Sequence, residues 1–293
     1  MLCNKLHINL KKCCYMYFSP HNKCSTDKIT DNDTNNDHDH NCQSLLLNDY
    51  KIKHVSETKF LGVTIDDRLN WGPHIKNMIT KLRSCTGQIY RFKDNIPQEL
   101  HKDIYHTLFE SHLTFGISVW GGLSINRYRP LFVIQKKCIR ILFGDNDAYK
   151  EKFKTCARAR PFGDQILGSD FYILESCKPL FTTYNILTVH NLYKYHCTLE
   201  TYKILKLRVP ISLYSLFVRS RRKETLLISQ PRSTNFLCMS TKLWNVFRQE
   251  LHIYDFSAVS IGSFKTKLKK NLLQSQKGQD IDVWCELNYQ GIK

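Results

Sequence analysis

The sequence contains no apolar run of the roughly 20 residues that a helix needs to cross a lipid bilayer. We therefore predict no transmembrane segment and no membrane partner. No secretory leader precedes the folded part, so we do not expect secretion either. The remaining expectation is an intracellular protein, nuclear or cytoplasmic.

The twelve cysteines include no C-x₂-C pair, which is the spacing that holds zinc with tetrahedral thiolates. Several of them, such as Cys138, stand among apolar residues, and we interpret them as reduced thiols that pack like small hydrophobic side chains. Asp, His and Cys side chains between Cys24 and Cys42 are the other metal candidate. An Asn- and Asp-rich run with few apolar residues favours disorder over a fixed ligand geometry, so we predict no metal site.

Carboxylates are scarce, because 26 Asp and Glu stand against 43 Lys and Arg and leave a formal net charge of +17. The first 50 residues hold five Lys and six Asp, a net of −1, so the other residues carry +18. Such a basic excess favours binding to a polyanion, since each phosphate contact releases condensed counterions. The alternative is an ordinary basic protein without a polyanionic partner.

The most informative stretch is KFLGVTIDDRLNWGPHI, which begins at Lys59. The β-forming residues on both sides of Gly62 predict a strand that runs through it. The Asp66-Asp67 pair predicts a turn after this strand, because short carboxylates hydrogen-bond to their own backbone. Pro73 suits the first turn of a helix, and apolar residues follow it at helical spacing. A sheet therefore ends here and a helical region begins.

Three stretches occur in the same order as in the reverse transcriptases of non-LTR retrotransposons. They are FLGVTID-x₂-LNW-x₂-HI, then FGISVWGG…VIQKKCIR from Phe115 to Arg140, then PLF, ILTVHNLYKYH and ETYKIL between Lys178 and Leu205. LWNVF, from Leu243 to Phe247, resembles the region beyond them, so the resemblance extends from about Leu6 to Leu273. The chain thus resembles the C-terminal part of a jockey- or RTE-like RNA-directed DNA polymerase, with the palm end, the thumb and the C-terminal region.

The resemblance implies a full-length protein that copies RNA into DNA with Mg²⁺ ions held by palm carboxylates. This chain has neither the carboxylate palm strand nor the tyrosine- or phenylalanine-x-Asp-Asp hairpin, so we expect no catalytic residue and no cofactor in it. Asp66 and Asp67 fall outside that hairpin and have no third carboxylate nearby, which argues against a two-metal site. The resemblance assigns Phe60, Leu61 and Gly62 to the hairpin that supports the 3′ end of the primer.

We predict an α+β fold that is mainly α, with a small β-hairpin palm remnant, a helical thumb bundle and a basic helical C-terminal region. The predicted parts are residues 1–72 (palm remnant, with a disordered loop at about 22–43), 73–146 (thumb-like three-helix bundle), 147–175 (linker) and 176–293 (C-terminal region). A hairpin is expected from residue 45 to residue 55. Because the other palm strands are missing, the apolar face near the N-terminus lacks cover, and we expect low stability there.

Pro, Gly and apolar spacing predict three helices in the thumb-like region. The first runs from about Pro73 to Lys93. The second starts at Pro97 and ends at Gly121-Gly122, with Leu100, Ile104, Leu108 and Leu113 as its buried stripe. The third starts near Arg127, buries Leu131, Ile134, Cys138 and Leu142, and stops at Gly144. The resemblance implies that such a bundle grips the template–primer duplex.

Basic residues beside these apolar stripes are the candidates for phosphate contact. They are Lys76, Lys81 and Arg83 on the first helix and Lys136, Lys137 and Arg140 on the third. A solvated charged face is the alternative interpretation of such residues. Farther along, residues 203–270 hold 14 Lys and Arg against three acidic residues, including a cluster of four cations: Arg219, Arg221, Arg222 and Lys223. Contact with RNA or DNA is the prediction for this cluster, and a nuclear-import signal and an ordinary charged surface are the alternatives.

Two further patterns mark the C-terminal region. Tyr184, Tyr193, Tyr195 and Tyr202 lie in a predicted helical pair, where we favour a core role over stacking on bases. Lysines from Lys265 to Lys270 line a predicted amphipathic helix with Phe264, Leu268 and Leu272 on its other side.

The leading hypothesis is therefore a polymerase fragment that lacks the catalytic hairpin and retains binding to RNA, DNA or both. We expect it to be inactive alone and to need the missing N-terminal polymerase half of its parent protein. A stand-alone nucleic-acid-binding module and a non-functional remnant of a mobile element are the alternatives.

Overall fold

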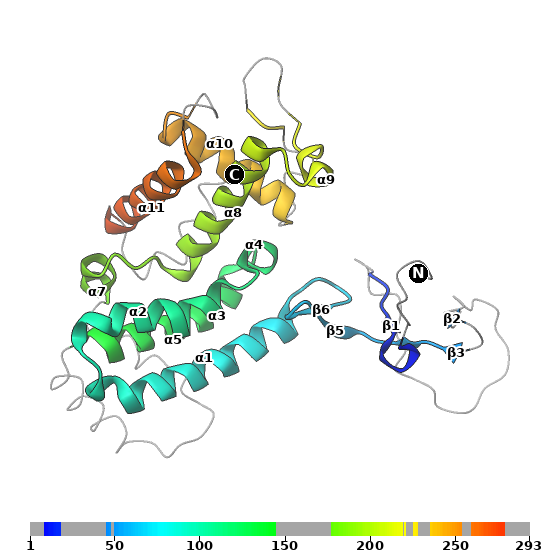
Figure 1. Cartoon of the computed structure of the whole chain (residues 1–293), viewed down its shortest axis with the longest axis horizontal. Helices are drawn as coiled ribbons and strands as arrows, with labels where there is room; N and C mark the ends of the chain where they lie inside the picture. The colour runs from blue at the N-terminus through cyan, green and yellow to red at the C-terminus, as the bar shows by residue number, and fades with distance from the viewer. Residues whose placement is uncertain are drawn as a thin grey trace. The chain divides into compact units, whose positions relative to one another are not determined.

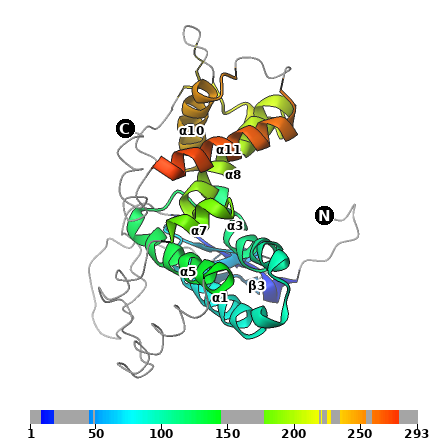
Figure 2. The same cartoon turned by 90° about the vertical axis from the view of Figure 1, so that its left-hand side faces the viewer.

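The computed structural model describes residues 9–18, 45–47, 50–144, 177–218, 220, 225–227, 235–253 and 259–278. They are mainly helical, with three two-stranded sheets before the first long helix, which confirms the predicted α+β class (Figures 1 and 2). Contacts divide the chain into two compact units, Met1–Asn77 and Met78–Lys293. The predicted loop at 22–43 and linker at 147–175 lie outside the described residues, and the predicted four-part division stays a prediction. Within the described residues, no helix combines the length and apolarity that a bilayer crossing requires.

The first unit contains short strands that pair two by two. The expected hairpin after residue 45 is present, because β2 (Leu46–Leu47) pairs antiparallel with β3 (Tyr50–Lys51). The strand β1 (Cys14–Tyr15) pairs in parallel with β4 (Lys53–His54). The third pair is β5 (Glu57–Phe60) with β6 (Val63–Asp66), which are antiparallel.

The predicted strand through Gly62 is wrong, because the chain reverses there. Phe60 pairs with Val63, so Leu61 and Gly62 form a two-residue hairpin loop. Their φ angles are 46° and 90°, both in the left-handed region, as in the two-residue turns that match the twist of paired strands. Glycine adopts this conformation without strain, which explains its place in the second position better than a strand does.

Asp66 organises the loop between β6 and the first long helix. Its side chain is buried, and its two carboxylate oxygens accept the backbone N–H groups of Asn70 and Trp71 at 3.0 and 2.7 Å. Leu69 and Trp71 take φ angles of 51° and 62°, which the carboxylate helps to hold. Asp66 thus has the structural role that the predicted turn assigns to it.

The apolar side chains of the first unit are largely uncovered. Among its described residues, Ile52 and Ile75 are the buried large apolar side chains. The exposed ones are Tyr17, Phe18, Leu45, Leu46, Tyr50, Phe60, Leu61 and Leu69. This exposure agrees with the predicted lack of cover near the N-terminus.

The first long helix, α1 (Gly72–Phe92), has the predicted bounds to within one residue. Pro73 stands in its first turn, and its buried stripe includes Met78, Leu82 and Ile89. A short 3₁₀ turn, η3 (Lys93–Asn95), ends it.

The predicted second helix is interrupted. Of its predicted buried stripe, Leu113 is buried as expected, but the two buried positions before it each follow the predicted ones by one residue. The 3₁₀ turn η4 (Gln98–Leu100) and α2 (His101–Ile104) lead into the π-helix η5 (Tyr105–Glu110), then α3 (Ser111–Thr114). Leu100 and Leu108 are exposed, whereas Tyr105, Phe109 and Leu113 are fully buried. A π-helix closes i→i+5 hydrogen bonds, so its turns are wider and the buried positions recur every fourth residue.

The helix is also interrupted before its predicted end at Gly121. Gly116 takes a φ of 64° and separates α3 from α4 (Ile117–Trp120). Gly121 approaches Tyr193 so closely that a Cβ there would lie 2.4 Å from its ring. This glycine therefore serves close packing as well as the end of the helix.

The third predicted helix is confirmed in full as α5 (Ile125–Phe143), with Gly144 after its last turn. All four side chains of its predicted stripe are buried: Leu131, Ile134, Cys138 and Leu142. The helices that follow the undescribed residues are α7 (Lys178–Thr183), α8 (Val189–Leu207), α9 (Ile211–Tyr214), α10 (Phe236–Glu250) and α11 (Ile261–Gly278).

The core of the C-terminal helices is built around α8, which lies against α10 and α11 (Figure 1). Tyr193, Tyr195 and Tyr202 are buried, which confirms the predicted core role for these three rings. The ring of Tyr202 stacks on Phe264 of α11 with centroids 4.0 Å apart.

Two buried glutamines hold the extended segment between α7 and α8 from both sides. Gln135 of α5 donates to the Leu187 carbonyl and accepts the Val189 N–H, each at 2.9 Å. Gln276 of α11 donates to the Ile186 carbonyl at 2.9 Å and accepts the Thr188 N–H at 3.2 Å. Each side-chain amide therefore pairs with the backbone as a neighbouring strand would.

Candidate nucleic-acid interface

Two of the predicted basic helices, α1 from Met78 onward and α5, pack together in the second unit. Thr86 and Cys85 of α1 both lie close enough to the Cys138 thiol of α5 to affect its pKa, which burial raises. Cys85 also donates its S–H to the Leu108 carbonyl at 3.2 Å. These contacts bring one side of α1 next to α5.

Neither helix contains a carboxylate. The sequence of α1 has four Lys and Arg, and that of α5 has five, with no Asp or Glu in either. Surface helices usually intersperse both signs, because pairs at i,i+4 spacing are stabilising. The one-sided charge indicates a surface suited to an anionic ligand.

Arg83 and Lys137 are the two candidates that the fold brings together. Burial lowers the pKa of the half-buried Lys137, and the nearby Arg83 guanidinium lowers it further. Like charges repel each other, and an anion near both groups would be attracted by both. Their positions, 54 residues apart in sequence, are joined only by the packing of α1 on α5.

Lys136 and Arg140 point to a different place. The Lys136 ammonium lies 4.9 Å from the centre of the Phe132 ring, a cation–π contact. Arg140 is buried, and both cations oppose the burial that raises the pKa of the Cys177 thiol. Their surroundings give these two residues packing roles within the helical unit, and their contact with phosphate stays a prediction.

Lys76 and Lys81 are both exposed on α1, but they do not share one side of it. A helix turns by about 100° per residue, so Lys76 falls on the flank of Arg83 and Lys81 on the other flank. The predicted cluster Arg219, Arg221, Arg222 and Lys223 lies outside the described residues.

The predicted primer-supporting residues form the tip of the β5–β6 hairpin. Phe60 and Leu61 expose 60% and 81% of their surface, and Gly62 is exposed beside them. An exposed apolar tip on a tight turn is compatible with contact to another molecule. Its role at a primer end stays a prediction.

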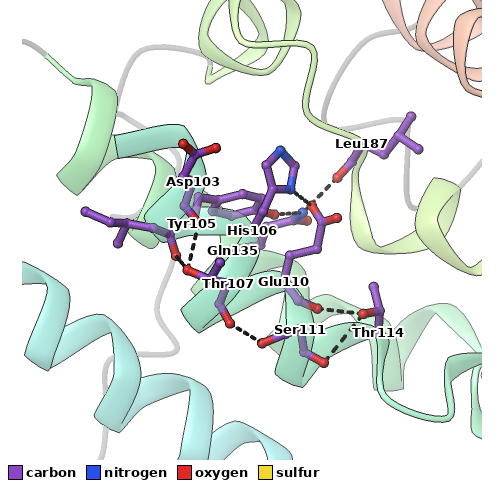
Figure 3. Close-up of polar contacts among 10 residues, drawn as sticks. Asp103, Tyr105, His106, Thr107, Glu110, Ser111, Thr114, Gln135 and Leu187 are labelled. Carbon is purple, nitrogen blue, oxygen red and sulfur yellow. Dashed lines mark hydrogen bonds and ion pairs between the residues drawn. The ribbon is translucent and has the colours of Figure 1, made fainter. Parts of the chain in front are cut away.

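Sequence reasoning missed a polar network along η5 (Figure 3). His106 pairs with Glu110 at 3.1 Å, and the Gln135 amide donates to the Tyr105 hydroxyl at 2.8 Å. Hydroxyls of Thr107, Ser111 and Thr114 donate to carbonyls one turn earlier along the helix. The only sequence signal was the Thr and Ser content, since such residues often bond back to the preceding turn.

No cluster of three His, Cys, Asp or Glu side chains suited to a metal ion occurs among the described residues. The described cysteines have free thiols, and those on the helices, such as Cys138 and Cys197, are buried. This placement agrees with their interpretation as core side chains.

Comparison with known proteins finds similarity over about a third of the chain. Part of it is similar to RNA-directed DNA polymerases of non-LTR retrotransposons, which confirms the predicted resemblance. The RNA-directed DNA polymerase from mobile element jockey of Drosophila melanogaster is 24% identical over 106 residues, 35% of this chain and 12% of that protein. The retrovirus-related Pol polyprotein from type-1 retrotransposable element R1 of Bradysia coprophila is 26% identical over 101 residues, 33% of this chain and 10% of that protein.

The matched stretch thus spans about a tenth of the length of these curated relatives. No protein-family model matches the chain, and no solved structure matches it.

Proposed function

We propose that this chain is the C-terminal part of a retrotransposon RNA-directed DNA polymerase and that it binds the backbone of a template–primer duplex or of the element's RNA. Copying of RNA into DNA belongs to the parent protein, with Mg²⁺ held by residues of the missing half. The chain alone binds and does not polymerise.

One observation carries the proposal: the sequences of α1 and α5 hold nine Lys and Arg and no carboxylate, six of these cations are exposed, and the two helices pack together. The pair Arg83–Lys137 is the part of this surface where two cations from different helices converge. Guanidinium and ammonium groups contact phosphates regardless of base sequence, so the expected binding is to the backbone. The similarity to RNA-directed DNA polymerases supports the same kind of ligand.

Binding to a fluorescently labelled RNA–DNA hybrid, measured across a salt series, tests the proposal. The informative variant combines Arg83→Ala with Lys137→Ala. Each lost phosphate contact lowers the slope of log K against log salt by roughly 0.9. When salt rises from about 50 to about 200 mM, the fold-decrease in affinity should therefore be about ten times larger for the unaltered chain than for the variant.

A charge-matched control combines Lys11→Ala with Lys51→Ala, because both lysines are exposed in the first unit. The control removes the same two charges and should keep the unaltered salt slope. Equal slopes for both variants would reject the α1–α5 surface as the binding site. Incorporation of nucleotides by this chain in the presence of Mg²⁺ would reject the inactive-fragment part of the proposal.

A further inference from the structure

The helix α11 packs against the rest of the helical unit by one side. Phe264, Leu268, Leu272 and Gln276, at every fourth position, are buried with at most 2% exposure. Phe264 stacks on Tyr202 of α8, and the Gln276 amide also accepts from the Asn191 side chain at 3.0 Å. Because both ends of this stripe are anchored on α8 and the segment before it, the opposite side has a fixed direction.

That opposite side carries three exposed lysines, Lys267, Lys270 and Lys277, which we call the α11 lysine face. Their spacing corresponds to a rise of about 4.5 and then about 10.5 Å along the helix axis. The exposed neutral side chains Ser263 and Gln274 lie among them and add hydrogen-bond donors.

No carboxylate occurs anywhere in the sequence of α11. No hydrogen bond or ion pair joins these three lysines to another described residue. Two other described lysines do pair with carboxylates, Lys203 with Glu200 at 2.9 Å and Lys93 with Asp94 at 3.5 Å. The α11 lysine face therefore differs from the mixed charges that solvated helices usually display.

The chemistry of this face selects among ligands. A lipid surface binds through an exposed apolar side of a helix, but the apolar side of α11 is buried against α8. A protein partner needs an apolar anchor at the centre of its interface, and the exposed side chains on this face are lysine, serine, threonine and glutamine, with the partly exposed Leu273 at its edge. Ammonium groups in a fixed row suit a series of phosphates.

We propose that the α11 lysine face is a second nucleic-acid site, which binds phosphodiester groups independently of base sequence and separately from the α1–α5 surface. The ligand class is that of the proposed function, but the observations come from a different helix. The two sites can therefore fail independently.

The test compares four proteins in one assay: the unaltered chain, Arg83→Ala with Lys137→Ala, the triple variant Lys267→Ala with Lys270→Ala and Lys277→Ala, and all five changes together. The probes are a blunt RNA–DNA hybrid and the same hybrid with a single-stranded RNA extension. Alanine favours helix at exposed positions, and circular dichroism at 222 nm checks that the triple variant folds.

We expect the triple variant to lose about 40-fold less affinity than the unaltered chain between about 50 and 200 mM salt, on at least one of the two probes. The three lysine changes should reduce the salt slope by the same amount when they are added to the Arg83→Ala with Lys137→Ala variant. A control with Lys11→Ala, Lys12→Ala and Lys51→Ala removes the same charge from the first unit and should leave the slope unchanged.

A triple variant with the unaltered salt slope on both probes would overturn the second site, whatever the double variant does. A reduced salt slope in the triple variant, with an unaltered slope in the double variant, would support the α11 site and reject the α1–α5 surface. Competition by poly-glutamate as strong as by RNA of equal charge would also overturn the proposal, because the face would then accept any polyanion.

Discussion

Replacing Gln135 with leucine should destabilise the helical unit strongly. Its amide is fully buried and makes three hydrogen bonds, to Tyr105, Leu187 and Val189, at 2.8 to 2.9 Å. Leucine has a similar volume, so the loss comes from polar groups left without partners. Each buried group left unsatisfied costs about 1–3 kcal/mol, and partial relaxation leaves an expected total of about 3–5 kcal/mol.

Urea unfolding followed by circular dichroism measures this change in the free energy of unfolding. The matched control is Gln88→Leu, which alters an exposed glutamine on α1 and should stay within about 0.5 kcal/mol of the unaltered chain. Gln276→Leu should destabilise by a similar amount, since it leaves the Ile186 carbonyl and the Thr188 N–H unpaired. A loss below about 1 kcal/mol for Gln135→Leu would refute the reasoning, because water would then be replacing the amide.

Two further predictions concern titratable groups. Burial raises the pKa of the Cys197 thiol to about 12 and also raises that of Cys138, so iodoacetamide at neutral pH should modify the exposed Cys14 and spare both. Peptide mass spectrometry measures the labelling, and equal rates at Cys14 and Cys138 would contradict the prediction. Burial, aided by Lys194, lowers the pKa of His190 to about 3. Between about pH 6.5 and 3, the unfolded chain therefore binds a proton on this histidine that the folded chain does not. The free energy of unfolding should fall by up to about 1.4 kcal/mol per pH unit on acidification through this range. The Nε2 atom of His190 is buried although the residue is partly exposed, and His190→Phe should flatten this slope in urea unfolding at several pH values.

The helices with regular apolar spacing could be predicted from sequence. The third helix was predicted with its buried stripe because its apolar residues keep the 3.6-residue period and Gly144 follows its end. The buried side of the second helix could not be predicted in this way. The 3.6-residue period predicts that Leu108 is buried, whereas the π-helix buries Phe109. A change of hydrogen-bond register is decided by packing, and no residue type announces it.

The candidate site shows the same division. Basic residues without neighbouring carboxylates are visible in the sequence, and so is the one-sided charge of α1 and α5. The proximity of Arg83 to Lys137 cannot be predicted from the sequence, because it depends on how two helices far apart in sequence pack. Lys136 has the same sequence signal as Lys137, yet its ammonium lies over Phe132.

The glutamine in α11 also sets an order of events during synthesis. Gln276 follows Thr188, whose N–H it accepts, by 88 residues. At ribosomal rates of about 5–20 residues per second, this interval lasts about 4–18 s. During that time α8 has been made, but the backbone groups before it have only Gln135 on one side and water on the other. The helical unit therefore reaches its complete core only when α11 leaves the ribosome, and a chaperone that covers α8 until then would act on this chain at its most exposed stage.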